Sequence, residues 1–120
     1  MAGSTESPFS HRRASSLRDM APEEIAWLAG WLEGEGTFGV QPGGYPKIAA
    51  ASVDLDVLER AHKLTHVGRI TQVKKQKDHH KQCWVWQVSR INDTVPLLEA
   101  ILPFMMERRA ARIRELLEAV

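Results

Sequence analysis

The nine residues Leu28 to Gly36 (LAGWLEGEG) lie where a helix is expected to end. The last four of them are two glutamates that alternate with two glycines. Apolar residues at helical spacing, preceded by Pro22 and two acidic residues, predict a helix that stops near Gly36. A glycine inside a helix costs about 1 kcal/mol relative to alanine. Gly30 and Gly34 are four residues apart and therefore lie on one face. A closely packed partner helix is the simplest compensation for their cost.

The carboxylates Glu33 and Glu35 fall at the end of this helix. Acidic groups near a helix C-terminus meet the negative end of the helix dipole, which is unfavourable. Carboxylate oxygens held there suit a hard divalent cation such as Mg²⁺. Two interpretations stay open: a metal site, or a solvated helix end whose glycines serve only helix packing.

The remaining elements follow from periodicity and turn residues. Residues 1–20 are small, polar and basic, which is typical of a disordered arm, and residues 21–120 form one domain. Apolar alternation predicts two hairpins, and helical spacing predicts three further helices, with Asn92 or Asp93 as the cap of the third helix in the chain. The predicted elements after the first helix are strands 37–41 and 45–53, helix 55–65, strands 69–75 and 82–89, helix 95–102 and helix 104–118.

The order helix, hairpin, helix, hairpin, helix, helix predicts an α+β fold with one antiparallel sheet covered by helices on one face. Strict alternation in the last strand places Trp84, Trp86 and Val88 on one face and Cys83, Val85 and Gln87 on the other. The tryptophans are interpreted as core residues, and Arg112 and Arg114 as solvated surface.

Charge is unevenly distributed along the 120 residues, although the formal net charge is only +1. Residues 61–90 carry seven Lys or Arg and a single acidic residue, Asp78. Such a local excess is typical of a polyanion-binding surface, and a solvated lysine-rich hairpin is the alternative. Cys83 is the only cysteine, which excludes an internal disulfide. No apolar run long enough for a membrane span or a secretory signal is present, so we expect an intracellular protein that contacts no membrane.

The segment Leu28 to Gly36, followed by Thr37 and Phe38, resembles the signature of the LAGLIDADG homing endonucleases. Four of its nine letters are identical, and glutamate stands in both acidic positions. The element order is similar to the αββαββα core of that family, and Ile101 to Phe104 before a basic helix resembles a later segment. The resemblance covers about residues 22–118. Because only one motif is present, it implies the homodimeric type.

This resemblance implies a role for each matched position. Glu35 matches the acid that binds the catalytic Mg²⁺ (or Mn²⁺), with the carbonyl of Gly34 as a further ligand. Arg108 matches the basic residue near the reacting phosphate, with Arg109 as a neighbouring candidate. Asp54 matches a polar residue that orders water. The residues assigned to the dimer interface are Ala29, Gly30, Glu33 and Gly34.

The resemblance also implies double-stranded DNA as the partner, read by the sheet in the major groove. The side chains expected to contact DNA are Lys47, Arg69, Thr71, Lys74, Lys75, Lys77 and Gln87, with Gln41 as a further candidate. The implied activity is metal-dependent hydrolysis of one phosphodiester per strand at a long pseudo-palindromic target. The alternative is a binding module on the same fold that has lost cleavage, either a DNA-binding regulator or an intron-RNA maturase.

A zinc protein built on His79, His80 and Cys83 is a competing interpretation. It requires a fourth ligand in most structural sites, and no second cysteine cluster exists in the sequence. A polar hairpin turn explains the same three residues.

Overall fold

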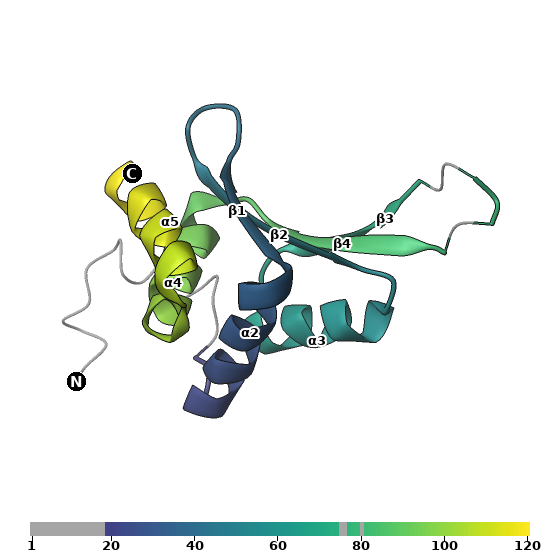
Figure 1. Ribbon diagram of the computed structural model, residues 1–120, viewed down its shortest axis with the longest axis horizontal. Helices are drawn as coiled ribbons and strands as arrows, with labels where there is room; N and C mark the ends of the chain where they lie inside the picture. The colour runs from purple at the N-terminus through teal and green to yellow at the C-terminus, as the bar shows by residue number, and fades with distance from the viewer. Residues whose placement is uncertain (1–18, 75–76, 80) are drawn as a thin grey trace, which may run out of the picture.

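The computed structural model describes residues 19–74, 77–79 and 81–120. The elements follow one another as helix, hairpin, helix, hairpin, helix, helix, which confirms the predicted α+β class (Figure 1). Their bounds are α2 Pro22–Glu35, β1 Gly36–Val40, β2 Pro46–Ser52, α3 Leu55–Thr65, β3 Arg69–Val73, β4 Cys83–Val88, α4 Ile91–Ile101, the 3₁₀ turn η2 Leu102–Phe104, and α5 Glu107–Glu118. Residues 1–18, which make up most of the predicted arm, lie outside the described ranges.

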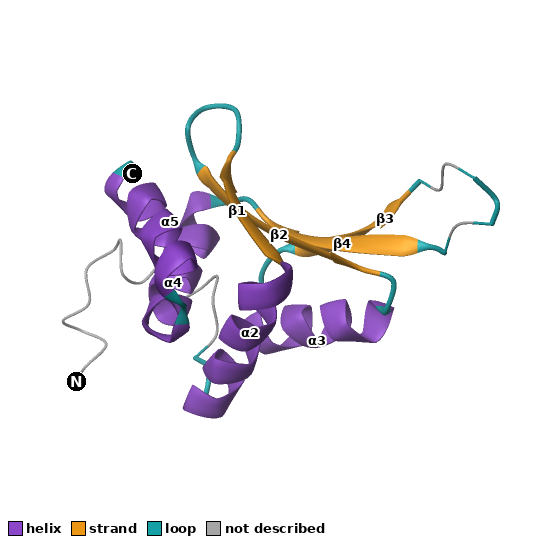
Figure 2. Ribbon diagram, in the orientation of Figure 1, coloured by secondary structure: helices purple, strands orange, loops and turns teal. Residues whose placement is uncertain are grey.

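The four strands form one antiparallel sheet in the order β1-β2-β4-β3. Both hairpins therefore lie side by side, and the helices cover one face of the sheet (Figure 2). The register places Gly36 opposite Ala50 and Gln87 opposite both Ala49 and Arg69. Because side chains alternate across a strand, one residue in two faces the helices and the next faces away from them.

Helix α2 passes into β1 without an intervening loop, and the sequence at both of its ends explains its length. Pro22 occupies the first turn, and the Glu24 carboxylate accepts a 2.9 Å hydrogen bond from the Ala21 N–H. At the other end, a Cβ on Gly36 would lie 2.7 Å from the Leu32 carbonyl oxygen. Only glycine fits this position, so the helix ends and the strand begins there.

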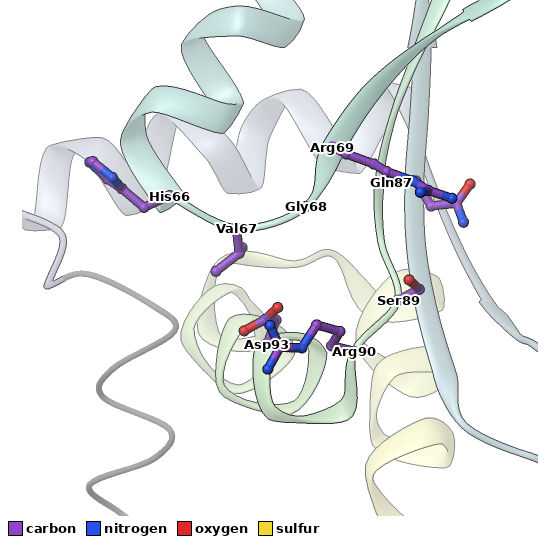
Figure 3. A pocket seen from close by; sticks show the side chains of 8 residues that line it. All are labelled: His66, Val67, Gly68, Arg69, Gln87, Ser89, Arg90 and Asp93. Atoms are coloured by element: carbon purple, nitrogen blue, oxygen red, sulfur yellow. The ribbon is translucent and has the colours of Figure 1, made fainter.

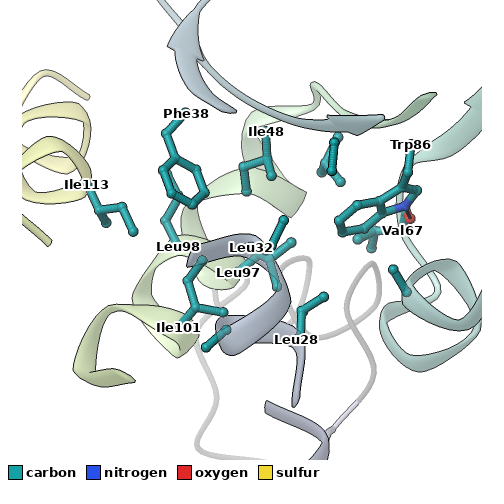
Figure 4. Close-up of a cluster of buried hydrophobic side chains, with 14 of the residues drawn as sticks. Leu28, Leu32, Phe38, Ile48, Val67, Trp86, Leu97, Leu98, Ile101 and Ile113 are labelled. Atoms are coloured by element: carbon teal, nitrogen blue, oxygen red, sulfur yellow. Dashed lines mark hydrogen bonds between the residues drawn. The ribbon is translucent and has the colours of Figure 1, made fainter. Parts of the chain in front are cut away.

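The hydrophobic core lies between the covered face of the sheet and the helices (Figure 4). Leu28 and Leu32 of α2, Ile48 of β2 and Trp86 of β4 are fully buried. The Trp86 indole N–H donates a 3.1 Å hydrogen bond to the Val67 carbonyl oxygen, so burial of this large side chain leaves no polar atom without a partner. Trp27, Trp31 and Trp84 pack against this cluster at its edge, which confirms the tryptophans as packing residues.

Two helices begin at residues other than those predicted. Helix α4 starts at Ile91 with Arg90 as its N-cap residue, so neither Asn92 nor Asp93 caps it. The prediction was wrong because Pro96 was taken as a first-turn proline, whereas it lies inside the helix. The last helix starts at Glu107 rather than residue 104, because Leu102–Phe104 forms a 3₁₀ turn and Met105 and Met106 are extended.

Candidate functional site

Glu35 is the last residue of α2 and is exposed. Within the part of the chain that the structure describes, its carboxylate makes no hydrogen bond or ion pair. No basic residue lies in the last turn of the helix to offset the dipole. The Glu35 carboxylate therefore lies at the corner where helix and sheet meet without a partner among the described residues, and the neighbouring Gly34 is exposed.

Glu33, two residues earlier, is engaged in a different way. Its Oε1 accepts a 2.8 Å hydrogen bond from the backbone N–H of Met106, the N-cap residue of α5. This contact joins positions that are 73 residues apart and fixes the start of α5 against the end of α2. The two acids of the segment therefore have different roles, one binding within the chain and the other facing solvent.

A groove of about 460 Å³ lies between β1 and α5, directly after Glu35 in the sequence. It is lined by Gly36, Thr37, Phe38, Arg108, Arg109 and Arg112. Arg112 had been interpreted as solvated surface, but its Nε donates a 3.0 Å hydrogen bond to the Phe38 carbonyl oxygen. A second bond of 2.6 Å, from Nη1 to Glu115, holds the guanidinium in this orientation. Arg112 thereby attaches α5 to the edge strand.

The other two arginines of the groove, Arg108 and Arg109, make no such bonds to any described residue. The Arg109 guanidinium lies 5.4 Å from the centre of the Phe38 ring, and its buried Nε has no hydrogen-bond partner among the described residues. Arg108 is exposed and lines the same groove. The fold thus concentrates positive charge beside Gly36, immediately next to Glu35.

Asp54 occupies the N-cap position of α3, and its side chain makes no capping hydrogen bond. Its backbone N–H donates to the Ser52 hydroxyl at 2.9 Å. Asp54 lies four residues beyond Ala50, the register partner of Gly36, and is not among the residues that line the arginine groove. Its predicted role in ordering water stays a prediction.

Four of the residues expected to contact DNA share the face of the sheet that the helices leave uncovered, here named the open face. Lys47 in β2 and Gln87 in β4 alternate with buried neighbours and so point away from the core. Arg69 and Thr71 in β3 are exposed, and their register partners Gln87 and Val85 place them on the same face. Lys74 and Lys77 are exposed beyond the end of β3, and Lys75 lies outside the described residues. Gln41 instead donates its amide hydrogens to the carbonyls of Pro46 and Ser89, which fixes the β1–β2 turn against β4.

A cavity of about 590 Å³ adjoins the open face where β3 begins and β4 ends. Arg69 and Gln87 stand at its upper side, and Arg90 and Asp93 at the start of α4 (Figure 3). Asp93 is only 4% exposed, and its Oδ1 has no hydrogen-bond partner among the described residues. Sequence reasoning missed this group because Asp93 was taken for a helix cap.

The outer face of α2 is exposed at Gly30 and Gly34. A Cβ on either glycine would meet no atom of the described residues within 4 Å. Ala29 was assigned to the same face, but it is fully buried in the core. The assignment of Ala29 was wrong because its position is turned about 100° from Gly30 around the helix, toward the sheet.

Solved structures with the same arrangement of elements are homing endonucleases. An archaeal intron-encoded homing endonuclease, I-Vdi141I, complexed with DNA, aligns with a TM-score of 0.61 at 22% identity over 80% of this chain and 67% of that one. I-CvuI in complex with its target gives a TM-score of 0.61 at 17% identity, over 91% of this chain and 67% of that one. The group I intron-encoded homing endonuclease I-CeuI, complexed with DNA, aligns with a TM-score of 0.59 at 18% identity, over 91% of this chain and 62% of that one.

The chain has the LAGLIDADG homing-endonuclease fold. It spans about two thirds of the length of these solved chains. No protein-family model matches the sequence, and neither does any curated protein.

Within this LAGLIDADG fold, the described residues of one copy do not assemble a set of metal ligands from acidic, histidine or cysteine side chains. Among the residues that are described, no three His, Cys, Asp or Glu side chains lie close enough together to hold an ion. The zinc interpretation therefore gains no support from His79 and Cys83, and His80 lies outside the described ranges. None of the helices in those ranges is long and apolar enough to cross a membrane.

Proposed function

We propose that this chain is a homing-type, metal-dependent DNA endonuclease that acts as a homodimer on a pseudo-palindromic duplex. The observation that carries the proposal is Glu35, an exposed carboxylate that has no partner among the described residues and ends a glycine-faced helix, on a fold whose solved examples are bound to DNA.

Dimerisation supplies the second half of the site. Gly30 and Gly34 leave the outer face of α2 without side chains, so the same helix of a second copy can approach closely. In a two-fold arrangement about this face, the two helix ends meet, and each copy contributes one Glu35. This arrangement accounts for the incomplete set of ligands among the described residues of a single chain.

The donors at the helix end fit a hard divalent cation. The Glu35 carboxylate and the carbonyl oxygen of Gly34 are both oxygen ligands, which Mg²⁺ and Mn²⁺ prefer. When bound there, the ion supplies charge stabilisation to the attacking and leaving oxygens of an in-line displacement. Glu33 stays on the Met106 N–H and acts by holding α5 in place.

Arg108 faces the scissile phosphate in this proposal. It is exposed in the groove that begins at Gly36, so its guanidinium can approach a phosphate next to Glu35. Arg112 acts indirectly, since its hydrogen bond to Phe38 fixes α5 and hence the position of Arg108. Water is the nucleophile, and Asp54 is the proposed residue that orders it.

The open face lies in the major groove. Arg69 and Gln87 are register partners and present a guanidinium and an amide side by side, groups that read guanine and adenine edges. Lys47, Lys74, Lys75 and Lys77 contact phosphates. Because these contacts release counterions, affinity falls steeply as salt rises.

The test separates binding from cleavage. Glu35→Gln protein selects its preferred duplex from a randomised library, and the wild type is then given that duplex with Mg²⁺ or Mn²⁺. We expect cleavage by the wild type to be at least about 100-fold faster than by Glu35→Gln, with similar affinities for DNA. Glu59→Gln, an exposed carboxylate on α3, is the matched control and keeps full activity. Equal cleavage by Glu35→Gln overturns the assignment.

A cleavage-deficient binding module is the second candidate. The feature that favours it is glutamate in both acidic positions, since one more methylene displaces a carboxylate within the strict octahedral shell of Mg²⁺. Tight, sequence-specific binding without cleavage by the wild type in either metal supports this candidate.

A further inference from the structure

The open face is divided into two halves of different chemistry. The register aligns its side chains in rows across the sheet. One row contains Arg69 and Gln87, and the adjacent positions toward the β3–β4 turn carry no long polar side chain. These positions, here named the apolar half, are Ala51, Thr71, Val73, Cys83 and Val85.

The apolar half forms two consecutive rows. Val85 lies between Ala51 and Thr71, and Cys83 lies opposite Val73. Ala51 and Thr71 are exposed, Val73 is 40% exposed, and no helix covers this face in the described structure (Figure 2). Methyl and thiol groups therefore form an uncovered strip on a strand surface where alternation would normally place polar residues.

Cations surround this strip. Arg69 lies beside it, and Lys74, Lys77 and Lys81 are exposed around the β3–β4 turn. An apolar strip with a basic rim is complementary to a polyanion that carries apolar groups between its charges. Duplex DNA is such a polyanion, because each thymine presents a C5-methyl group in the major groove, and Ala and Thr methyl groups are its usual contacts.

The spacing of the rows also matches DNA. Residues two apart on one strand are separated by about 6.8 Å, and base pairs are stacked about 3.4 Å apart, so neighbouring rows correspond to steps of two base pairs. From this match, and resting on the proposed function, we infer that the apolar half reads thymine methyl groups. The half-site then favours A·T pairs two and four base pairs from the position contacted by Arg69 and Gln87, on the side toward the β3–β4 turn.

The test removes one methyl group from the duplex and the two γ-methyl groups of a valine from the protein. The duplex selected by the Glu35→Gln protein is remade with 2′-deoxyuridine in place of single thymines, which deletes only the C5-methyl. We expect affinity to fall about fourfold at the positions that face Val85 and Val73, the factor for one buried methyl group. In the Val85→Ala protein, the deoxyuridine substitution at the position facing Val85 should have a clearly smaller effect on affinity, while the position facing Val73 stays as sensitive as in the wild type.

Two further variants make the result decisive. Val85→Thr replaces one of the two γ-methyl groups by a hydroxyl of similar size, so it keeps the sheet intact and should show a sensitivity between those of the wild type and Val85→Ala. Lys74→Ala should weaken binding to every duplex and reduce the salt dependence without changing the response to deoxyuridine.

The possible results separate the two proposals. Sequence-specific binding that is indifferent to every deoxyuridine, or equally sensitive in wild type and Val85→Ala, overturns the thymine inference and leaves DNA binding standing. Failure to select any sequence from the library overturns both.

Discussion

Gly30 is the position at which we expect one substitution to have opposite effects on the single chain and on the proposed dimer. In the chain, a Cβ at Gly30 would meet no described atom within 4 Å, so alanine is accommodated without strain. Alanine is favoured over glycine inside a helix by about 1 kcal/mol. We therefore expect Gly30→Ala to raise the free energy of unfolding of the monomer by about 1 kcal/mol, measured by urea denaturation at a concentration where light scattering shows monomers.

The same methyl group should weaken the dimer. If two α2 helices pack on their glycine faces, two-fold symmetry inserts two methyl groups into one interface. Overpacking of this kind costs about 1–3 kcal/mol, which corresponds to a dimer dissociation constant about 5 to 150 times larger. Gly30→Leu should abolish the dimer at micromolar concentrations. Sedimentation velocity across a dilution series measures both variants.

The matched control is Ala111→Leu, which enlarges an exposed residue on α5 away from the α2 face. It should leave the dimer unchanged. A Gly30→Leu protein that dimerises as well as the wild type would refute the glycine-face interface. A fall in monomer stability in Gly30→Ala would show instead that the face is already covered within one chain.

Two further predictions concern stability. Glu33→Ala removes the acceptor of the Met106 N–H and should lower the free energy of unfolding by about 1 kcal/mol in urea denaturation, whereas Glu33→Gln, which keeps an acceptor oxygen, should restore most of it. The Asp93 carboxylate is buried, and one of its oxygens has no partner among the described residues. Asp93→Asn puts a neutral amide of the same shape in its place and should raise the free energy of unfolding by about 1 kcal/mol. A loss of stability in Asp93→Asn would mean that the carboxylate has a stabilising partner.

Local patterns were sufficient for the order of the elements and for the open face, although not for the first residues of α4 and α5. Alternation from Cys83 to Val88 places Gln87 on one face and Trp86 on the other, and the structure has both there. The glycine spacing in α2 likewise identified a face that the structure leaves open at Gly30 and Gly34. These features depend on residues a few positions apart. At that distance, the helical period of 3.6 residues or the strand period of 2 determines which face a side chain points to.

The interactions that position α5 could not be predicted in this way. The hydrogen bonds from Met106 to Glu33 and from Arg112 to Phe38 join residues more than 70 positions apart. Nothing in the local sequence distinguishes Arg112 from a solvated arginine, because its partner is a backbone carbonyl on the edge strand. The burial of Asp93 escaped prediction for a related reason, since it depends on where the α3–β3 turn packs against α4.

The direct passage from α2 into β1 has a consequence for how such a protein acquires a new target. Glu35 ends the helix and Gly36 begins the strand, so no loop separates the proposed catalytic carboxylate from the proposed base-reading surface. If both proposals hold, the distance between the cleaved bond and the recognised bases is set by the fold. We then expect that exchanging side chains on the open face changes which sequence is recognised, while the position of the break within that sequence stays constant.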